Sequence, residues 1–182
     1  MRVISGVLKG RNVKGYDIDG TRPTMDRVKE SMFATIQNNL KDSVCLDLFC
    51  GSGNLGIEAI SNGSKLCYFV DNNIKAIKVV EENLKTLNIK NNSKILNFDY
   101  KKSLKYFNEN NIKFDLIFVD PPYDYHVIEK VIKYVDEYNL LNNEGLLVLE
   151  FENERLEEVY GNLHLIKYKK YSWKYVYIYK KQ

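Results

Sequence analysis

The feature that most constrains the fold is a regular alternation of apolar runs and helical patterns that begins near residue 43. Short runs rich in Val, Ile, Leu and Phe are separated by segments in which apolar residues recur every three or four positions. The runs cover 44–49, 65–71, 93–99, 114–120 and 145–151, and the helical patterns cover 54–61, 74–87, 102–109 and 127–135. Continuous apolar strands connected through helices indicate a mostly parallel sheet with helices on both faces. We therefore predict an α/β fold of the Rossmann-like type.

The first part of the chain departs from this alternation. Residues 2–13 alternate loosely between apolar and polar side chains, with two glycines among them, and this predicts a short β-hairpin. Apolar residues then recur on one helical face between residues 25 and 40, with Thr24 as the expected N-cap. We assign residues 1–42 to an N-terminal extension made of this hairpin and helix.

The last part of the chain also departs from the alternation. Residues 164–171 and 174–181 are rich in lysine and tyrosine and flank a short polar break, which predicts two strands joined by a tight turn. Such a pair would close one edge of a seven-stranded sheet as an antiparallel hairpin. We interpret it as a sheet edge rather than as a platform for RNA, because tyrosine is common in strands. Residues 43–182 form the predicted main domain.

Composition limits the classes of protein that fit this chain. A length of 182 residues with 45% hydrophobic residues suits one ordinary domain with a core of its own. The three cysteines are odd in number and lack CxxC spacing, so we predict neither a disulfide framework nor a metal site. No apolar run approaches the roughly 18 residues of a membrane span, and the first residues show no signal core. We expect a cytoplasmic monomer with no membrane partner.

Acidic residues end four of the expected strands: Asp47, Asp71, Asp99 and Asp120. In open parallel sheets, ligands bind beyond the carboxyl ends of the strands, so these side chains predict one common site. Asp71 follows Asp47 by about the spacing at which a carboxylate receives ribose hydroxyls in nucleotide-binding units. Asp99 is placed to accept a hydrogen bond from an adenine amino group. The alternative is that strand-end aspartates only cap helices.

A glycine-rich turn narrows the choice of cofactor. Residues 47–56 are DLFCGSGNLG, and glycines at this place let the backbone turn tightly and approach a ligand. An aspartate at position 47 would repel a pyrophosphate, but it suits the cationic sulfonium and ammonium groups of S-adenosylmethionine. The chain contains no Gly-Lys-Ser/Thr sequence, which excludes a P-loop. The predicted cofactor-binding residues are Asp47, Phe49, Gly51, Ser52, Gly53, Asp71, Asn72, Asp99 and Tyr100.

A second motif, DPPY at residues 120–123, follows the fourth strand. Together with DxFxGSGxxG, it resembles the class I S-adenosylmethionine-dependent methyltransferases that methylate planar amino nitrogens. Such an amine is a poor nucleophile because its lone pair is delocalised, and two acceptors on its N–H bonds draw it towards a pyramidal geometry. Asp120 and the carbonyl of Pro121 can supply these acceptors, Pro121 and Pro122 restrict the backbone, and Tyr123 can stack on an extruded base. The alternative is a tight turn with adjacent prolines.

The resemblance extends along nearly the whole chain. RVISGVLKGR, TRPTMDRVKESMF, DLFCGSGNLGIEA and FVDPPY are together similar to the bacterial 16S ribosomal RNA guanine-N2 methyltransferases of the small, single-domain type. The resemblance implies methylation of one guanine of 16S rRNA, within the small ribosomal subunit or an assembly intermediate. It implies RNA contacts by Arg2, Lys9, Arg11, Arg22, Thr24 and Arg27. The alternatives are a solvated basic surface, a structural Asp26–Arg27 pair and a purely capping role for Thr24.

Other functions would use the same chemistry or only the same fold. One is methylation of adenine N6 in DNA or RNA, and another is methylation of a glutamine amide, which usually goes with NPPY rather than DPPY. A third is a non-catalytic ribosome assembly factor, against which the intact glycine turn and DPPY motif argue. We interpret His126 and His164 as structural or surface residues, and Cys50 as a small residue within the glycine turn.

Overall fold

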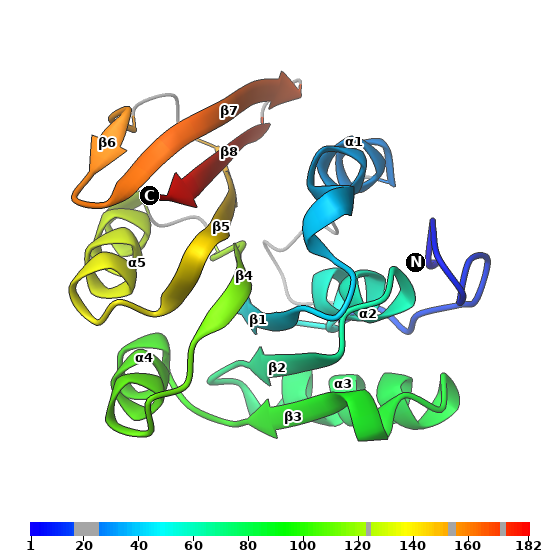
Figure 1. Cartoon of the computed structure of the whole chain (residues 1–182). Helices are drawn as coiled ribbons and strands as arrows, with labels where there is room; N and C mark the ends of the chain where they lie inside the picture. Colours follow the sequence, from blue (N-terminus) through cyan, green and yellow to red (C-terminus); the bar gives the residue numbers. More distant parts are fainter. Residues whose placement is uncertain (17–25, 123–124, 153–155, 172–173) are drawn as a thin grey trace.

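The structure is a computed structural model that describes residues 1–16, 26–122, 125–152, 156–171 and 174–182, with the main chain only at 125–126. Its strands are β1 (Val44–Leu48), β2 (Leu66–Val70), β3 (Ser93–Leu96), β4 (Phe114–Val119), β5 (Leu141–Phe151), β6 (Val159–Tyr160), β7 (Leu163–Tyr171) and β8 (Lys174–Lys181). They form one sheet in the order β3-β2-β1-β4-β5-β8-β7-β6 (Figure 1). The predicted α/β architecture is confirmed.

The sheet combines a parallel part with an antiparallel edge. The strands from β3 to β5 pair in parallel, whereas β8, β7 and β6 are each added in antiparallel orientation. The predicted C-terminal hairpin is therefore present. The described sheet has eight strands, one more than predicted, because Val159–Tyr160 pairs with β7. Two residues are too few to show an alternating pattern in the sequence, so this strand left no signal there.

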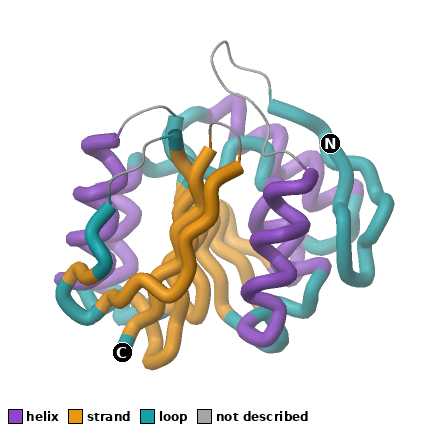
Figure 2. The backbone as a smooth tube through the Cα atoms, turned by 90° about the horizontal axis from the view of Figure 1, so that it is seen from above, coloured by secondary structure: helices purple, strands orange, loops and turns teal. Residues whose placement is uncertain are grey.

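Helices cover both faces of the sheet, as Figure 2 shows. They are α1 (Asp26–Ile36), α2 (Asn54–Ser61), α3 (Ile74–Thr86), α4 (Tyr100–Glu109) and α5 (Tyr125–Glu137), with short 3₁₀ helices at Gln37–Asn39 and Lys90–Asn92. Apolar side chains of α1, α2 and α3 share one core cluster with one face of the sheet, and those of α4 and α5 share a second cluster with the other face. No helix of the described residues is long and apolar enough to cross a membrane.

Helix α1 packs directly over the strand that leads to the DPPY motif. Its apolar residues Met32, Phe33 and Ile36 are almost fully buried, and the ring of Phe33 stacks on that of Phe118 in β4 with centroids 5.6 Å apart. The start of α1, at Asp26, follows a segment outside the described residues, which includes the predicted N-cap Thr24. The division of the chain at residue 43 stays a prediction, since α1 and the sheet share one core cluster.

The predicted N-terminal hairpin is a small loop that lies beside α2 (Figure 1). Its two arms meet through a single bridge between Arg2 and Asn12, with backbone hydrogen bonds from Val3 N to Arg11 O (2.9 Å) and from Gly10 N to Val3 O (2.8 Å). A two-armed loop of this size makes too few pairs to be stable alone. Its position therefore depends on contacts with the rest of the protein.

Candidate functional site

The candidate site is built around the turn between β1 and α2. Phe49, Gly51 and Gly53 all adopt positive φ angles, of 63°, 53° and 78°. At Gly53, a Cβ atom would also lie 3.1 Å from the ring of Phe69 and 3.3 Å from Val80, so both conformation and space require glycine. Phe49 holds the same left-handed conformation without being glycine, and such strained residues cluster at functional sites. The turn fits a backbone that must approach a ligand.

Asp47 lies beneath this turn rather than at its surface. Its side chain is 2% exposed, and Oδ2 accepts a hydrogen bond from Gly56 N at 2.8 Å, which holds the first turn of α2 against β1. Burial raises the pKa of Asp47 well above its usual range, and the charges of Asp120 and Asp71 raise it further. The charges of Asp120 and Asp71 therefore act on Asp47, as expected for side chains at one edge of the sheet.

Asp71 connects the end of β2 to the glycine turn. Its Oδ2 accepts a hydrogen bond from Gly51 N at 3.0 Å, and its Oδ1 accepts one from Asn73 N at 2.8 Å. The neighbouring Asn72 is exposed, and Asn73 caps α3 by accepting from Lys75 N. The end of β2 and the glycine turn are therefore joined by a direct hydrogen bond.

Asp99 and Tyr100 lie at the start of α4, three and four positions beyond the end of β3. Asp99 is exposed, and its Oδ1 caps the helix by accepting from Lys102 N at 3.0 Å, which is the structural role weighed as the alternative. The ring of Tyr100 lies 5.6 Å from that of Phe49 at an angle of 41°. The fold therefore brings Tyr100 to the glycine turn, while Asp99 has a capping bond of its own.

Asp120 directly follows β4, and its side chain is 29% exposed. Pro121 is buried and Pro122 is exposed, while Tyr123 lies outside the described residues. The ammonium group of Lys174, at the start of β8, lies 3.9 Å from Asp120 Oδ1 and also contacts the carboxylate of Glu150 on β5. No pattern in the amino-acid sequence indicated these two neighbours, because they come from strands 30 and more residues further along the chain.

Two other residues of the site carried no sequence signal. Asn83 on α3 is buried and donates to Ser52 O (3.0 Å) and Lys14 O (3.0 Å), so it holds the glycine turn and the segment after the hairpin together. Tyr16 follows that segment, and within the described residues its ring is the one neighbour that a Cβ atom at Gly51 would meet within 4 Å. Only the three-dimensional structure shows that these two residues belong to the site, since both lie far from the turn in sequence.

Tyr16 also carries the one buried side-chain polar atom that lacks a partner within the described residues, its hydroxyl oxygen. Burial raises the pKa of Tyr16, and the negative charge of Asp71 raises it further. Buried polar atoms are normally hydrogen-bonded, so a buried hydroxyl next to the glycine turn with no partner among the described residues fits a ligand with polar groups of its own. The residues present therefore fit a nucleoside-bearing cofactor.

The predicted RNA-contacting residues are only partly described. Arg2, Lys9, Arg11 and Arg27 are all exposed, whereas Arg22 and Thr24 lie outside the described residues. Arg2 pairs with Asp26 (Nε–Oδ2, 3.4 Å). Lys9, Arg11 and Arg27 form no ion pair with the part of the chain that the structure describes. They therefore leave positive charge at the surface of the N-terminal extension.

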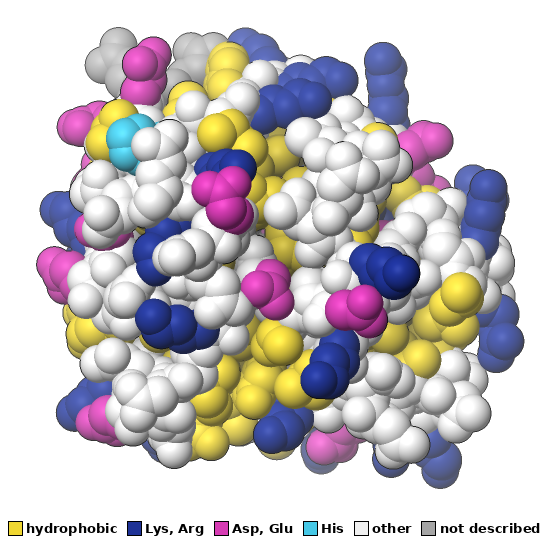
Figure 3. Space-filling model, viewed as in Figure 1, with side chains coloured by type: hydrophobic (Ala, Val, Ile, Leu, Met, Phe, Trp, Pro, Cys, Tyr) yellow, Lys and Arg dark blue, Asp and Glu magenta, His cyan; other side chains and the backbone are white. Residues whose placement is uncertain are grey.

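The lysine-rich β7 adds basic side chains at another place. Lys167, Lys169 and Lys170 are exposed, and the first two contact α1 through Thr35 Oγ1 (3.0 Å) and Ser31 Oγ (3.2 Å). On the face drawn in Figure 3, basic and acidic side chains interleave, apart from a group of basic ones at the upper edge, where β7 ends in Figure 1. The tyrosines of β8 are buried, because this strand lies between β5 and β7 inside the sheet.

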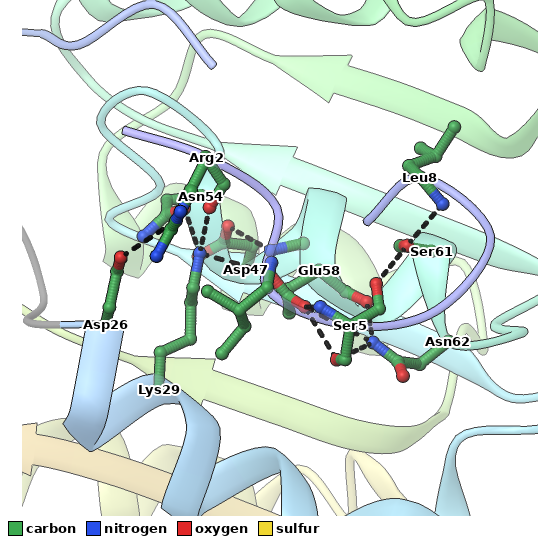
Figure 4. A network of polar contacts seen from close by, with 12 residues as sticks. Arg2, Ser5, Leu8, Asp26, Lys29, Asp47, Asn54, Glu58, Ser61 and Asn62 are labelled. Atoms are coloured by element: carbon green, nitrogen blue, oxygen red, sulfur yellow. Dashed lines mark hydrogen bonds and ion pairs between the residues drawn. The ribbon is translucent and has the colours of Figure 1, made fainter. Parts of the chain in front are cut away.

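A buried ion pair anchors the N-terminal hairpin (Figure 4). Lys29 of α1 and Glu58 of α2 are both fully buried, with Nζ and Oε2 3.0 Å apart. Lys29 also donates to Arg2 O (2.9 Å) and Asn54 Oδ1 (2.8 Å), and Glu58 accepts from Ser5 N (2.8 Å). The extension that carries the exposed basic residues is therefore fixed to the helix that begins at the glycine turn.

The structure supports no catalytic role for the three cysteines. Cys45, Cys50 and Cys67 are free and buried, and burial raises the pKa of each thiol, to about 11 for Cys45. A thiol that stays protonated is a weak nucleophile. Within the described ranges, no group of three or more His, Cys, Asp or Glu residues could hold a metal ion.

Comparison with known proteins identifies relatives of this chain. The sequence profile of the family described as "Conserved hypothetical protein 95" matches residues 1–180. YlbH of Bacillus subtilis, provisionally named as an rRNA methyltransferase, is 41% identical over 183 residues, covering 100% of both chains. Ribosomal RNA small subunit methyltransferase D of Haemophilus influenzae is 33% identical over 158 residues, covering 85% of this chain and 80% of that one. The structure of yhhF from Escherichia coli, provisionally named as a methyltransferase, has a TM-score of 0.87 and 29% identity, covering 100% of this chain and 98% of that chain.

Proposed function

The chain belongs to the Conserved hypothetical protein 95 family, and from this premise we propose that it methylates the exocyclic N2 amine of a guanine in 16S ribosomal RNA, with S-adenosylmethionine as donor. The observation that carries the proposal is the position of Asp120, which follows β4 at the edge where Asp47, Asp71 and the glycine turn also lie. Relatives named as rRNA methyltransferases support the class of reaction and of substrate.

The cofactor site would combine the glycine turn with the side chains around it. Asp71 would receive the ribose hydroxyls, and the hydroxyl of Tyr16, which has no partner within the described residues, would be available to the same ligand. Phe49 and Tyr100 offer an aromatic wall, and Gly51 lets the backbone come close. The remaining members of the proposed set are Ser52, Gly53, Asn72, Asp99 and, from beneath the turn, Asp47. When bound, S-adenosylmethionine supplies an electrophilic methyl group on a sulfonium.

Asp120 would act on the amine that receives the methyl group. Its carboxylate and the carbonyl of Pro121 accept the two N–H hydrogens, which draws the nitrogen lone pair out of conjugation. The negative charge of Asp120 then stabilises the ammonium that forms on transfer. Catalysis of this kind depends mainly on alignment, and adjacent prolines at 121 and 122 limit the freedom of the backbone that provides it. Tyr123 remains the proposed stacking partner of the base.

The substrate side of the proposal depends on the N-terminal extension. Arg2, Lys9, Arg11 and Arg27, with Arg22 and Thr24 in the undescribed segment, would contact RNA phosphates and guide the base. We propose the small ribosomal subunit or its assembly intermediate as the partner, which places the reaction in the cytoplasm, and a monomer as the active form. Adenine N6 or a glutamine amide is the second candidate, because the same acceptors would serve either amine.

The test is methyl transfer from labelled S-adenosylmethionine to small ribosomal subunits purified from cells that lack this protein. We expect N2-methylguanosine in the 16S RNA, identified by mass spectrometry of its nucleosides. Asp120→Ala should lower kcat by about 10²–10³-fold while cofactor binding, measured by calorimetry, is retained. Label in adenine or in protein would support the second candidate, and cofactor binding without any transfer would support the assembly-factor alternative. An Asp120→Ala variant with full activity would exclude the proposed mechanism.

A further inference from the structure

We propose that Lys174 and Glu150 form a positioning pair that holds the carboxylate of Asp120 in the orientation that methyl transfer requires. The inference rests on the proposed function and deepens it, because it names two residues, beyond the DPPY motif, on which the rate of that reaction depends.

The three side chains meet because of the antiparallel direction of β8. Asp120 follows the carboxyl end of β4, and Glu150 lies near the carboxyl end of the neighbouring β5. Strand β8 runs against β5, with Phe151 opposite Tyr175, so its first residue, Lys174, lies at this same edge. A parallel strand in that position would have brought its last residue there instead.

The three side chains lie close together, and two of them are almost fully buried. Lys174 Nζ contacts Glu150 Oε1 and lies 3.9 Å from Asp120 Oδ1. The side chains of Lys174 and Glu150 are 8% and 1% exposed, whereas that of Asp120 is 29% exposed. The pair is therefore closed off from water on one side of Asp120, while Asp120 itself remains reachable by a substrate.

The charges explain why a pair is present rather than a single lysine. Among the described contacts, one ammonium and two carboxylates together carry one net negative charge. A lone lysine beside Asp120 would neutralise it and compete with the substrate amine for its oxygens. Glu150 compensates Lys174, so Asp120 stays oriented by the ammonium and still carries charge to stabilise a developing cation.

The protonation state of the lysine agrees with this role. Burial lowers the pKa of Lys174, but the charges of Asp120, Glu150 and Glu152 raise it, and the net result lies above the usual value. Lys174 is therefore an ammonium at neutral pH. From the opposite side, β1 presents Asp47, whose charge is coupled to that of Asp120. The ammonium of Lys174, on the β8 side, favours the charged form of Asp120 beside this acidic neighbour.

The experiment compares the wild type with the double variant Glu150→Met/Lys174→Met. Replacing both members of a buried ion pair with apolar residues of similar size often preserves folding, whereas removing one leaves an unpaired charge. We expect the double variant to lose between about 10-fold and 100-fold in kcat, as for a misplaced catalytic group, with KM for small subunits and Kd for S-adenosylmethionine within about twofold of the wild type. Thermal denaturation would verify that the variant folds.

A control variant and a second readout make the result decisive. Lys180 lies at the other end of β8 and pairs with Glu144 at the surface, so Lys180→Met should leave kcat unchanged. The carboxyl signal of Asp120 in carbon NMR should titrate at a higher pH in the double variant than in the wild type, because the ammonium 3.9 Å from Asp120 is gone. A double variant with wild-type kcat and unchanged Asp120 titration would overturn the proposal. If the wild type transferred no methyl group, the proposed function would fail, and the NMR titration alone would decide whether the pair orients Asp120.

Discussion

The described part of the chain contains two buried lysine–glutamate pairs, and they differ in what surrounds them. Lys29 and Glu58 are fully enclosed, and their remaining polar atoms bond to the backbone of the N-terminal hairpin and to Asn54. Lys174 and Glu150 are almost as buried, but beyond their own contact the ammonium approaches a third, partly exposed carboxylate, Asp120. The first pair connects elements of the structure, and the second adjoins the candidate site.

Burial alone therefore does not distinguish a structural ion pair from an ion pair that adjoins a functional site. Breaking either pair leaves a buried charge, which is strongly destabilising in both cases. What separates them is the third partner: backbone N–H and C=O groups at Lys29–Glu58, and a solvent-accessible carboxylate at Lys174–Glu150. Stability should therefore respond to the first pair, and the rate of methyl transfer should respond to the second.

Glu58→Ala should give the largest loss of stability. The substitution leaves the Lys29 ammonium buried without a counter-ion and removes the acceptor of Ile4 N and Ser5 N. We expect the free energy of unfolding to fall by about 3–5 kcal/mol, measured by urea denaturation. Glu82→Ala, which breaks the exposed pair with Lys14, is the control and should cost less than about 1 kcal/mol. Similar losses in the two variants would contradict the anchoring role of Lys29–Glu58.

Asp47→Asn should have a smaller effect of opposite sign, and one that depends on pH. The pKa of Asp47 in the folded protein lies above its unfolded value, chiefly because of burial, so the folded state holds more protons between the two values. Stability of the wild type therefore falls as pH rises through that window, and the asparagine, which can still accept from Gly56 N, avoids this loss. We expect the variant to be more stable by about 1 kcal/mol at pH 8, or about 2–4 °C in Tm.

The difference in stability between Asp47→Asn and the wild type should shrink as pH is lowered, because the wild-type carboxyl then becomes protonated in the folded state. Melting curves from pH 5 to pH 8.5 would measure it. The affinity of the same variant for the cofactor would show whether Asp47 is a structural or a functional carboxylate. Weaker binding together with higher stability would place Asp47 with the site, whereas unchanged binding would make it a residue that only holds α2. A difference that grew at low pH would contradict the assigned direction of the pKa.

Tyr16→Phe should give the smallest effect. The hydroxyl has no partner within the described residues, so its loss should change the stability of the free protein by less than about 0.5 kcal/mol. If it bonds the cofactor, Kd for S-adenosylmethionine should rise by about two- to tenfold, as for one neutral hydrogen bond. Calorimetry on both proteins would measure the change. An unchanged Kd would remove Tyr16 from the proposed cofactor site.

The motifs that could be interpreted from the sequence were local ones. DLFCGSGNLG and DPPY each lie within ten residues, and their glycines and prolines restrict the backbone wherever the chain goes. The family resemblance that they carried is confirmed by the profile match and by relatives named as rRNA methyltransferases. Asp99 shows the limit of such inference, because a carboxylate after a strand can also cap the next helix, and here it does.

From the amino-acid sequence alone we could predict the alternation of strands and helices, the glycine turn and the acidic strand ends, because each depends on neighbouring residues and a fixed period. Which distant side chains contact these features depends on the tertiary structure. Tyr16, Asn83 and Lys174 reach the site from a loop, a helix and an antiparallel strand, and Lys29 meets Glu58 across two helices. Lysine and glutamate are normally surface residues, so no pattern marks the few that are buried, and their partners depend on packing between elements that are far apart in the chain.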